Sequence, residues 1–239
     1  NTGKNHEYYY QLGVRELDSG HVKAAIAAFR KSIQMNPGDP RPYSNLGIAY
    51  ELARDYGRAR KAYEKAIEIN PGNASTLNNL AGLSLLDGKP SEAVDLYDSA
   101  IASDPEYIEP YLNIARFFME SRKLYQAEMY LRQVLDIDPE NVEALNMIGV
   151  ITNLTERSEE AVDYFRDAIR QKSDEASLFS NLGTALRNTG DLRRALLAFE
   201  KASELNPPGS GILNNLGMLC RETGDLSRAE AYFNKAIAA

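Results

Sequence analysis

The sequence contains few of the residues that carry redox, metal or nucleophilic chemistry. One cysteine and two histidines occur among its 239 residues. Cys220 has no second cysteine with which to form an internal disulfide, and we expect it to pack in a core. His6 and His21 stand fifteen residues apart, with no cysteine, histidine or acidic cluster at the spacing of metal ligands. The sequence therefore predicts no metal, no cofactor and no catalytic residue.

Glycine-rich phosphate loops and nucleophile elbows are also absent, and no apolar run is long enough to cross a bilayer. The formal net charge is −7, whereas a protein that binds the backbone of DNA or RNA needs a clustered basic surface. The sequence begins at Asn1 and shows no basic and apolar leader. We expect a soluble protein that binds no nucleic acid. We expect it in the cytoplasm, or in the periplasm if a leader has been trimmed.

What the sequence does contain is a period of 34 residues that no insertion interrupts. An aromatic or large apolar residue marks the periods at Tyr9, Tyr43, Leu77, Tyr111, Leu145, Phe179 and Leu213. Alanine recurs in step at Ala25, Ala59, Ala93, Ala127, Ala161, Ala195 and Ala229. Prolines close five of the periods, at Pro37, Pro71, Pro105, Pro139 and Pro207. A fixed period of this length indicates tandem structural repeats.

Each period is expected to form two amphipathic helices, over residues 41–52 and 56–69 in the second period. Glycine inside a helix costs about 1 kcal/mol relative to alanine. The recurrence of Gly47 and its equivalents therefore predicts a close crossing of the two helices, with Ala59 and its equivalents facing the glycine. Between the helices, a left-handed residue is expected. It is glycine at Gly20, Gly88, Gly190 and Gly224, whereas Arg54, Arg122 and Glu156 must close their turns without glycine.

The order of aromatic, Leu-Gly, aromatic, Ala, aromatic, Ala and Pro resembles the tetratricopeptide repeat family. The resemblance implies an all-α, right-handed α-solenoid of seven helix-turn-helix repeats in one array over residues 1–239. The expected repeats are 6–39, 40–73, 74–107, 108–141, 142–175, 176–209 and 210–239. Helices this short are marginal alone, so each must be held by its neighbours in the stack.

Asparagine recurs at the sixth residue of the repeats, on the first-helix face away from the packed markers. It occupies this position at Asn45, Asn79, Asn113, Asn181 and Asn215, with Gln11 in the first repeat and Met147 in the fifth. Random placement of the 18 asparagines would put about half of one there. Asparagine forms helices poorly, so propensity does not explain the series. Two explanations stay open: the amides bind the backbone of an extended peptide, or they bond neighbouring helices and tune the stack.

The phrases SNLG, NNLA, LNIA, SNLG and NNLG around this series look like the repeat arm of the O-linked N-acetylglucosamine transferases. In that family such a ladder holds the backbone of the substrate or partner. The resemblance covers the repeat subtype, and no glycosyltransferase domain lies within these residues. Basic residues on the same face, at Arg116, Arg187 and Arg221, favour an acidic end on the bound segment.

The sequence therefore predicts a non-catalytic protein-interaction scaffold that binds an extended peptide along its groove. Two alternatives are the substrate-recognition arm of a larger enzyme, such as a glycosyltransferase, and a self-assembling structural array. The last repeat also suggests self-association, because Leu226, Phe233 and Ile237 are expected to leave an apolar strip on an uncapped second helix.

Overall fold

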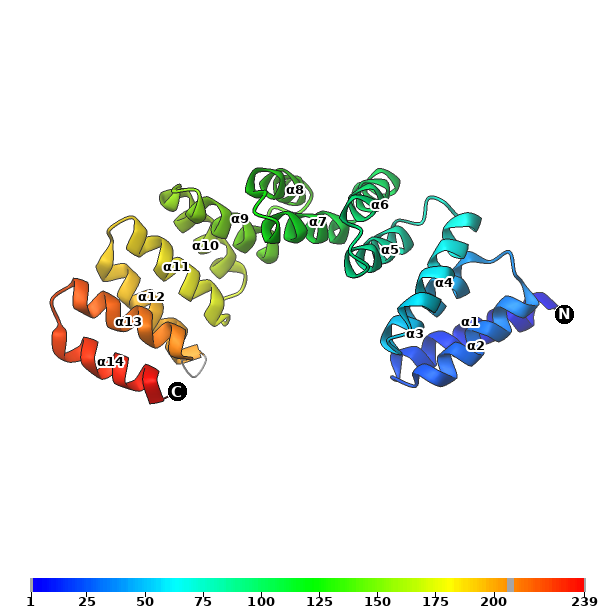
Figure 1. The fold of residues 1–239 in the computed structure, drawn as a ribbon, viewed down its shortest axis with the longest axis horizontal. Coiled ribbons are helices and arrows are strands. Elements are labelled where there is room, and N and C mark those ends of the chain that lie inside the picture. Colours follow the sequence, from blue (N-terminus) through cyan, green and yellow to red (C-terminus); the bar gives the residue numbers. More distant parts are fainter. Residues whose placement is uncertain (1, 206–208, 239) are drawn as a thin grey trace. The chain divides into compact units, whose positions relative to one another are not determined.

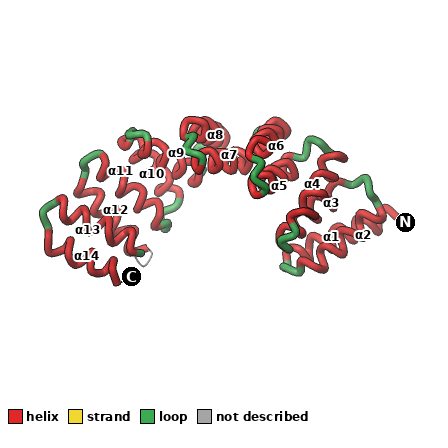
Figure 2. The backbone as a smooth tube through the Cα atoms, in the orientation of Figure 1, coloured by secondary structure: helices red, strands yellow, loops and turns green. Residues whose placement is uncertain are grey.

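The computed structural model describes residues 2–205 and 209–238, with side chains described from Asn5 onward. Within these ranges, every regular element is an α-helix and none is a strand (Figure 2). The helices are α1 (Thr2–Asp18), α2 (Val22–Met35), α3 (Pro40–Leu52), α4 (Tyr56–Ile69), α5 (Ala74–Leu86), α6 (Pro90–Ser103), α7 (Ile108–Glu120), α8 (Leu124–Ile137), α9 (Val142–Leu154), α10 (Ser158–Gln171), α11 (Ala176–Asn188), α12 (Leu192–Leu205), α13 (Ser210–Glu222) and α14 (Leu226–Ala238). The all-α prediction is confirmed for the described part of the chain, and α3 and α4 match the predicted bounds to within one residue.

The chain divides into two compact units, Asn1–Ile114 (unit 1) and Ala115–Ala239 (unit 2), with the boundary inside α7. Figure 1 shows odd-numbered helices, here called first helices, followed by even-numbered second helices after a short turn. In unit 1, α1, α3 and α5 each pack on the second helix that follows, and in unit 2 α9, α11 and α13 do the same. The second helices α2 and α4 of unit 1, and α8, α10 and α12 of unit 2, each contact the next first helix. This arrangement is a helical solenoid of the predicted repeats.

The helix ends follow local signals in the sequence. Asp39 and Asn73 cap α3 and α5, because their side chains accept hydrogen bonds from the backbone N–H groups of Arg41 and Thr76 at 3.0 Å. The turns inside the repeats use a left-handed residue, as predicted, with φ of 70–84° at Gly20, Gly88, Gly190 and Gly224. The same conformation occurs without glycine at Arg54, Arg122 and Glu156, where φ is 58°, 59° and 63°. Among the prolines expected to close repeats, Pro207 lies outside the described residues.

The glycines of the first helices face aromatic rings of the second helices. A Cβ placed on Gly149 would lie 2.6 Å from the Phe165 ring, and one on Gly183 would lie 2.9 Å from the Phe199 ring. Gly47 is covered in the same way by Tyr63. The predicted close crossing is therefore present, and an aromatic ring supplies its closest contacts. Ala59 is fully buried, yet the atoms nearest to the glycine belong to the ring one helical turn further along α4.

The remaining sequence predictions about the core have mixed outcomes. Cys220 is buried, with 1% of its surface exposed, and burial raises the pKa of its thiol. On α14, Leu226 and Ile237 are exposed as expected. Phe233 is partly exposed, and its ring also packs against Gly217. No helix in the described ranges combines the length and the apolarity that a bilayer span requires.

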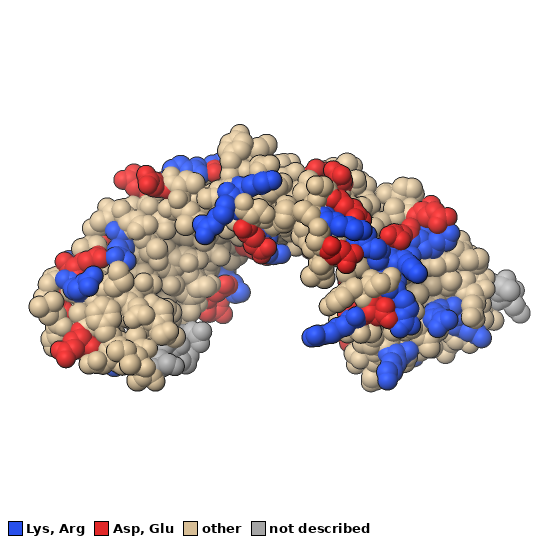
Figure 3. Space-filling view, in the orientation of Figure 1, with Lys and Arg blue, Asp and Glu red and all other residues tan. Residues whose placement is uncertain are grey.

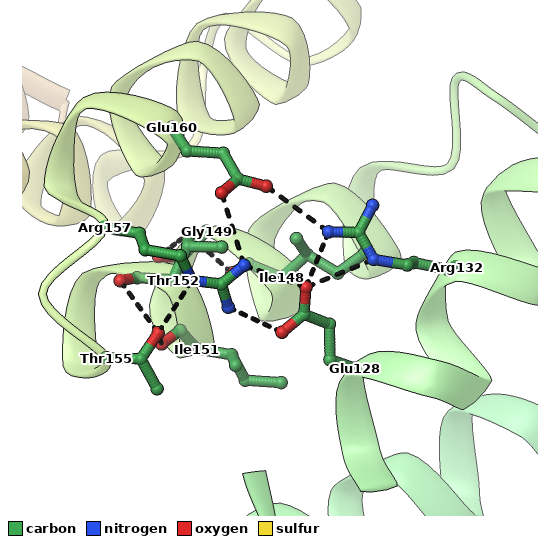
Figure 4. Close-up of polar contacts among 9 residues, drawn as sticks. All are labelled: Glu128, Arg132, Ile148, Gly149, Ile151, Thr152, Thr155, Arg157 and Glu160. Carbon is green, nitrogen blue, oxygen red and sulfur yellow. Dashed lines mark hydrogen bonds and ion pairs between the residues drawn. The ribbon is translucent and has the colours of Figure 1, made fainter. Parts of the chain in front are cut away.

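A network of charged side chains joins neighbouring repeats in unit 2 (Figure 4). Glu128 of α8 has a side chain that is 12% exposed and pairs with Arg157, just before α10, at 2.5 Å. Arg132, one turn further along α8, pairs with the same carboxylate at 2.6 Å and also with Glu160 of α10. Hydrogen bonds from Arg157, and secondarily Arg132, hold the pKa of the Glu128 carboxyl below its usual range. This network links the second helices α8 and α10 of adjacent repeats. It does not include residues of the first-helix face.

Candidate functional site

The asparagines predicted as binding residues all lie on first helices, where they are half-buried rather than fully exposed. Asn45, Asn79 and Asn113 belong to unit 1, and Asn181 and Asn215 belong to unit 2. Met147 interrupts the series as a buried side chain, 8% exposed. Gln11 is exposed and donates a hydrogen bond to Glu7 at 2.9 Å. We use the name "asparagine series" for these five asparagines.

Several amides of the series connect one repeat to the previous one. In unit 1, the Nδ2 of Asn113 donates to the Oδ1 of Asn78 at 2.9 Å, and the Nδ2 of Asn45 donates to the Tyr10 hydroxyl at 3.3 Å. In unit 2, the Nδ2 of Asn181 donates to the Oδ1 of Asn146 at 2.9 Å. Each bond joins residues 35 apart in the chain. These contacts give the asparagines a structural role between repeats, which was the second explanation left open by the sequence.

A second set of amides, at the fifth residue of alternate repeats, was missed by the sequence reasoning. It comprises Asn78, Asn146 and Asn214. Asparagine recurs at this position in the third, fifth and seventh repeats, and this recurrence could have been detected in the sequence. Asn78 also donates to the Oδ1 of its neighbour Asn79 at 3.4 Å, so the Asn113, Asn78 and Asn79 amides form a chain across two first helices. Hydrogen bonds in such a chain polarise one another and fix the orientation of each carboxamide.

Hydrogen-bonding capacity remains on the series after these contacts. A carboxamide has two N–H donors and an oxygen that accepts twice. Within the described residues, the Oδ1 atoms of Asn45 and Asn181 accept no hydrogen bond, and the side chain of Asn215 makes none. An oriented, half-buried amide with open donor and acceptor sites is suited to binding a peptide backbone.

The predicted basic residues of this face are mostly neutralised by glutamates. Arg116 pairs with Glu143 at 2.5 Å. Arg187 donates hydrogen bonds to both carboxylate oxygens of Glu222 at 2.5–3.2 Å. Arg221 is exposed and pairs with no acidic group in the described ranges. Figure 3 shows Lys and Arg interspersed with Asp and Glu over much of the visible surface. The expected positive tendency is therefore confined to Arg221.

A group that the sequence did not reveal lies at the start of unit 1. His6, Glu7 and Asp39 offer ligand atoms within 4.8 Å of one another, although Asp39 is distant in sequence. Arg41 already binds both carboxylates, at 2.8 Å to Glu7 and 2.7 Å to Asp39. A metal cation here would have to displace this guanidinium or face its charge. The arrangement is better explained as an ion-pair cluster that joins α1 to α3.

Another unpredicted contact lies in the middle of unit 1. The Tyr63 hydroxyl of α4 donates to the Oε2 of Glu51 on α3 at 3.0 Å. Burial raises the pKa of Glu51, and the hydrogen bond from Tyr63 opposes that effect. Burial, and next the charge of Glu51, raises the pKa of Tyr63, whereas a hydrogen bond with Asn79 lowers it. The hydroxyl thus binds a carboxylate and lies near an amide of the asparagine series.

Paired helices with glycine under an aromatic ring and a left-handed turn define a tetratricopeptide-repeat protein. The chain belongs to the family described as the cilia and flagella-associated protein 70 C-terminal domain, whose family model matches residues 22–239. It is also 34% identical over 58 residues to an uncharacterized protein of Methanocaldococcus jannaschii, a match that covers 24% of this chain and 67% of that protein.

Solved structures share the fold at low sequence identity. The C-terminal part of a TPR repeat-containing protein from Cytophaga hutchinsonii has a TM-score of 0.79 and 16% identity, over 96% of this chain and 94% of that one. A tetratricopeptide repeat protein from Parabacteroides merdae has a TM-score of 0.69 and 19% identity, over 98% and 93%. YrrB, described as a TPR protein with an unusual peptide-binding site, has a TM-score of 0.65 and 22% identity, over 83% and 98%.

Proposed function

We propose that this protein is a non-catalytic interaction scaffold that binds an extended segment of a partner polypeptide along its first helices. The observation that carries this proposal is the asparagine series, which repeats at one position and leaves oriented amide groups open on the first-helix face. A series that served only to join repeats would need no such spare capacity. The tetratricopeptide-repeat fold supports a partner that is a protein.

The amides favour recognition of backbone over recognition of particular side chains. Each carboxamide can accept from a peptide N–H and donate to a peptide C=O. First helices of adjacent repeats come close enough for the Asn181 and Asn146 side chains to bond, and neighbouring helices lie about 8–10 Å apart. An extended chain advances about 3.3 Å per residue. About three residues of the bound segment would therefore reach from one amide, such as Asn181, to the next, Asn215. A register of this kind leaves the intervening side chains to determine specificity.

The resemblance of the series to the repeat arm of O-linked N-acetylglucosamine transferases agrees with backbone recognition. YrrB, which shares the fold, is described as having a peptide-binding site. Neither likeness identifies the partner, so the proposal depends on the amides of this chain.

The proposal is tested with peptides selected from a random display library against the full chain. Each selected peptide is then resynthesised with single N-methylated residues, and separately with single alanines. If asparagine amides hold the backbone, N-methylation at about every third residue should abolish binding, while most alanine replacements should be tolerated. The reverse pattern would show that side chains carry the recognition.

The matching protein variants are Asn181→Ala with Asn215→Ala, and Asn234→Ala as the control. Asn234 is an exposed asparagine on the second helix α14, so its loss changes the same chemistry away from the first-helix face. Each lost hydrogen bond is worth about 0.5–1.5 kcal/mol, which predicts a loss of affinity of roughly five- to 140-fold for the double variant. Equal affinities for the double variant and the control would contradict the proposal.

A further inference from the structure

Glu51 is a half-buried carboxylate on a first helix without a basic partner. Its one hydrogen bond comes from the Tyr63 hydroxyl, and no basic group in the described ranges lies within ion-pair distance of it. The two most buried carboxylates of the described residues are different, because Asp39 and Glu128 are each held by arginine. A charge that is partly removed from water without a cation is unfavourable unless something else compensates it.

The position of Tyr63 carries a hydroxyl only in the second and third repeats, at Tyr63 and Tyr97. Tyr63 occupies the position at which four other repeats have phenylalanine, namely Phe29, Phe165, Phe199 and Phe233. Its ring lies under Gly47 like the others. Packing alone therefore does not require the oxygen. The oxygen instead reaches the first helices, where it donates to Glu51 of α3 and lies near Asn79 of α5.

Gly82 leaves open space on the same face of α5 as Asn79. It lies in the middle of α5, three residues after Asn79, and residues three apart share a helix face. A Cβ added to Gly82 would meet only the Tyr97 hydroxyl, at an ordinary contact distance of 3.9 Å. The equivalent residues of neighbouring repeats are larger, as in Val14 and Ile48. Because helix packing does not require this glycine, the open space calls for another explanation.

We propose that Glu51, Tyr63 and Asn79 form a subsite for a lysine side chain of the bound segment, with Gly82 leaving room for the aliphatic part of that side chain. The inference rests on the proposed function, since it adds one side-chain preference to backbone binding. An ammonium group would supply the cation that Glu51 lacks, and Asn79 offers a second oxygen to its donors.

Lysine fits this geometry better than arginine. A guanidinium binds a carboxylate best through two parallel hydrogen bonds, which use both oxygens. The Oε2 atom of Glu51 already accepts a hydrogen bond from Tyr63. A guanidinium bound to both carboxylate oxygens would therefore compete with that bond. A compact ammonium needs only the remaining oxygen and can direct its other donors elsewhere.

The test uses four peptide pools with lysine, arginine, norleucine or glutamate fixed at one position and all other positions randomised. Each pool is titrated against the full chain, its Glu51→Gln variant and its Glu120→Gln variant. Glutamine keeps an acceptor for Tyr63, so folding should be preserved. Glu120 is an exposed glutamate near the end of the first helix α7, and its replacement controls for the loss of one negative charge.

In the wild type, the lysine pool should bind roughly tenfold more tightly than the norleucine pool, with arginine between them. That preference should disappear in Glu51→Gln and persist in Glu120→Gln. Gly82→Leu, which fills the space with a better helix former, should lose the preference while its melting temperature stays at or above that of the wild type.

Two results would overturn the inference while leaving the scaffold intact. One is binding of all four pools without a preference for lysine, and the other is a lysine preference that survives in Glu51→Gln. If no pool bound the wild type, wherever in the peptide the fixed residue was placed, the proposed function itself would fail. The lysine subsite would then fail with it.

Discussion

Replacing Gly149 by alanine tests whether the glycines of the first helices are present for close packing. The added Cβ would lie 2.6 Å from Cε1 of Phe165 and 2.9 Å from two further ring atoms. Ordinary van der Waals contact begins near 3.4 Å, so the ring or the helix must retreat by close to 1 Å. Phe165 is 1% exposed, which leaves its ring no open space into which to turn.

Two opposing effects determine the sign of the change in stability. Alanine in the helix interior gains about 1 kcal/mol over glycine. Overpacking a dense core costs about 1–3 kcal/mol. The net expectation is destabilisation by about 1 kcal/mol. Gly82→Ala is the matched control, because it lies equally deep in a helix but would make only one contact, at 3.9 Å. It should stabilise the chain by up to about 1 kcal/mol.

The assay is urea denaturation followed by circular dichroism, with both variants compared with the wild type. A double variant, Gly149→Ala with Phe165→Leu, should recover part of the loss, because the fourth repeat pairs Ala115 with Leu131 at the same positions. The third repeat pairs Ala81 with Tyr97, both buried, so a helix pair can also be built around alanine and a ring. If both glycine variants gained stability to a similar extent, the close-packing explanation would be refuted.

Three further predictions concern the contacts between and within repeats. Hydrogen bonds from Arg157 lower the pKa of the Glu128 carboxyl, so its contribution to stability is full above the unfolded pKa of about 4.3 and is lost as pH falls through the folded pKa. Urea midpoints measured between about pH 6 and pH 3 should therefore fall less steeply in Glu128→Gln, and parallel pH profiles would contradict this. Asn181→Ala should cost about 1 kcal/mol by thermal denaturation, since it breaks the inter-repeat bond to Asn146. Asn215→Ala should cost less than about 0.5 kcal/mol, and equal costs would remove the distinction between bonded and open amides. Glu156→Gly should stabilise its turn by about 0.5–1 kcal/mol, because φ there is 63°. Slower amide exchange in the surrounding turn would support it, and faster exchange would contradict it.

The candidate site could be predicted from the sequence only in part. The position of the asparagines on first helices followed from the period and the helical pattern. Their hydrogen bonds did not, because the bond from Asn181 to Asn146 depends on how far one repeat is shifted against the next. The neutralisation of Arg187 by Glu222 is likewise a contact between repeats, and it removed a positive charge that the sequence had suggested for partner recognition.

What the sequence determined by itself is the local structure of each repeat. Apolar periodicity, caps such as Asp39 and left-handed turn residues act over a few residues, so their consequences can be read along the chain. Tertiary structure decided which side chains meet across helices: the ring over Gly47, Arg41 against Glu7, and Tyr63 against Glu51. These contacts depend on helix spacing and on the shift between stacked repeats, which the packing of many side chains sets together.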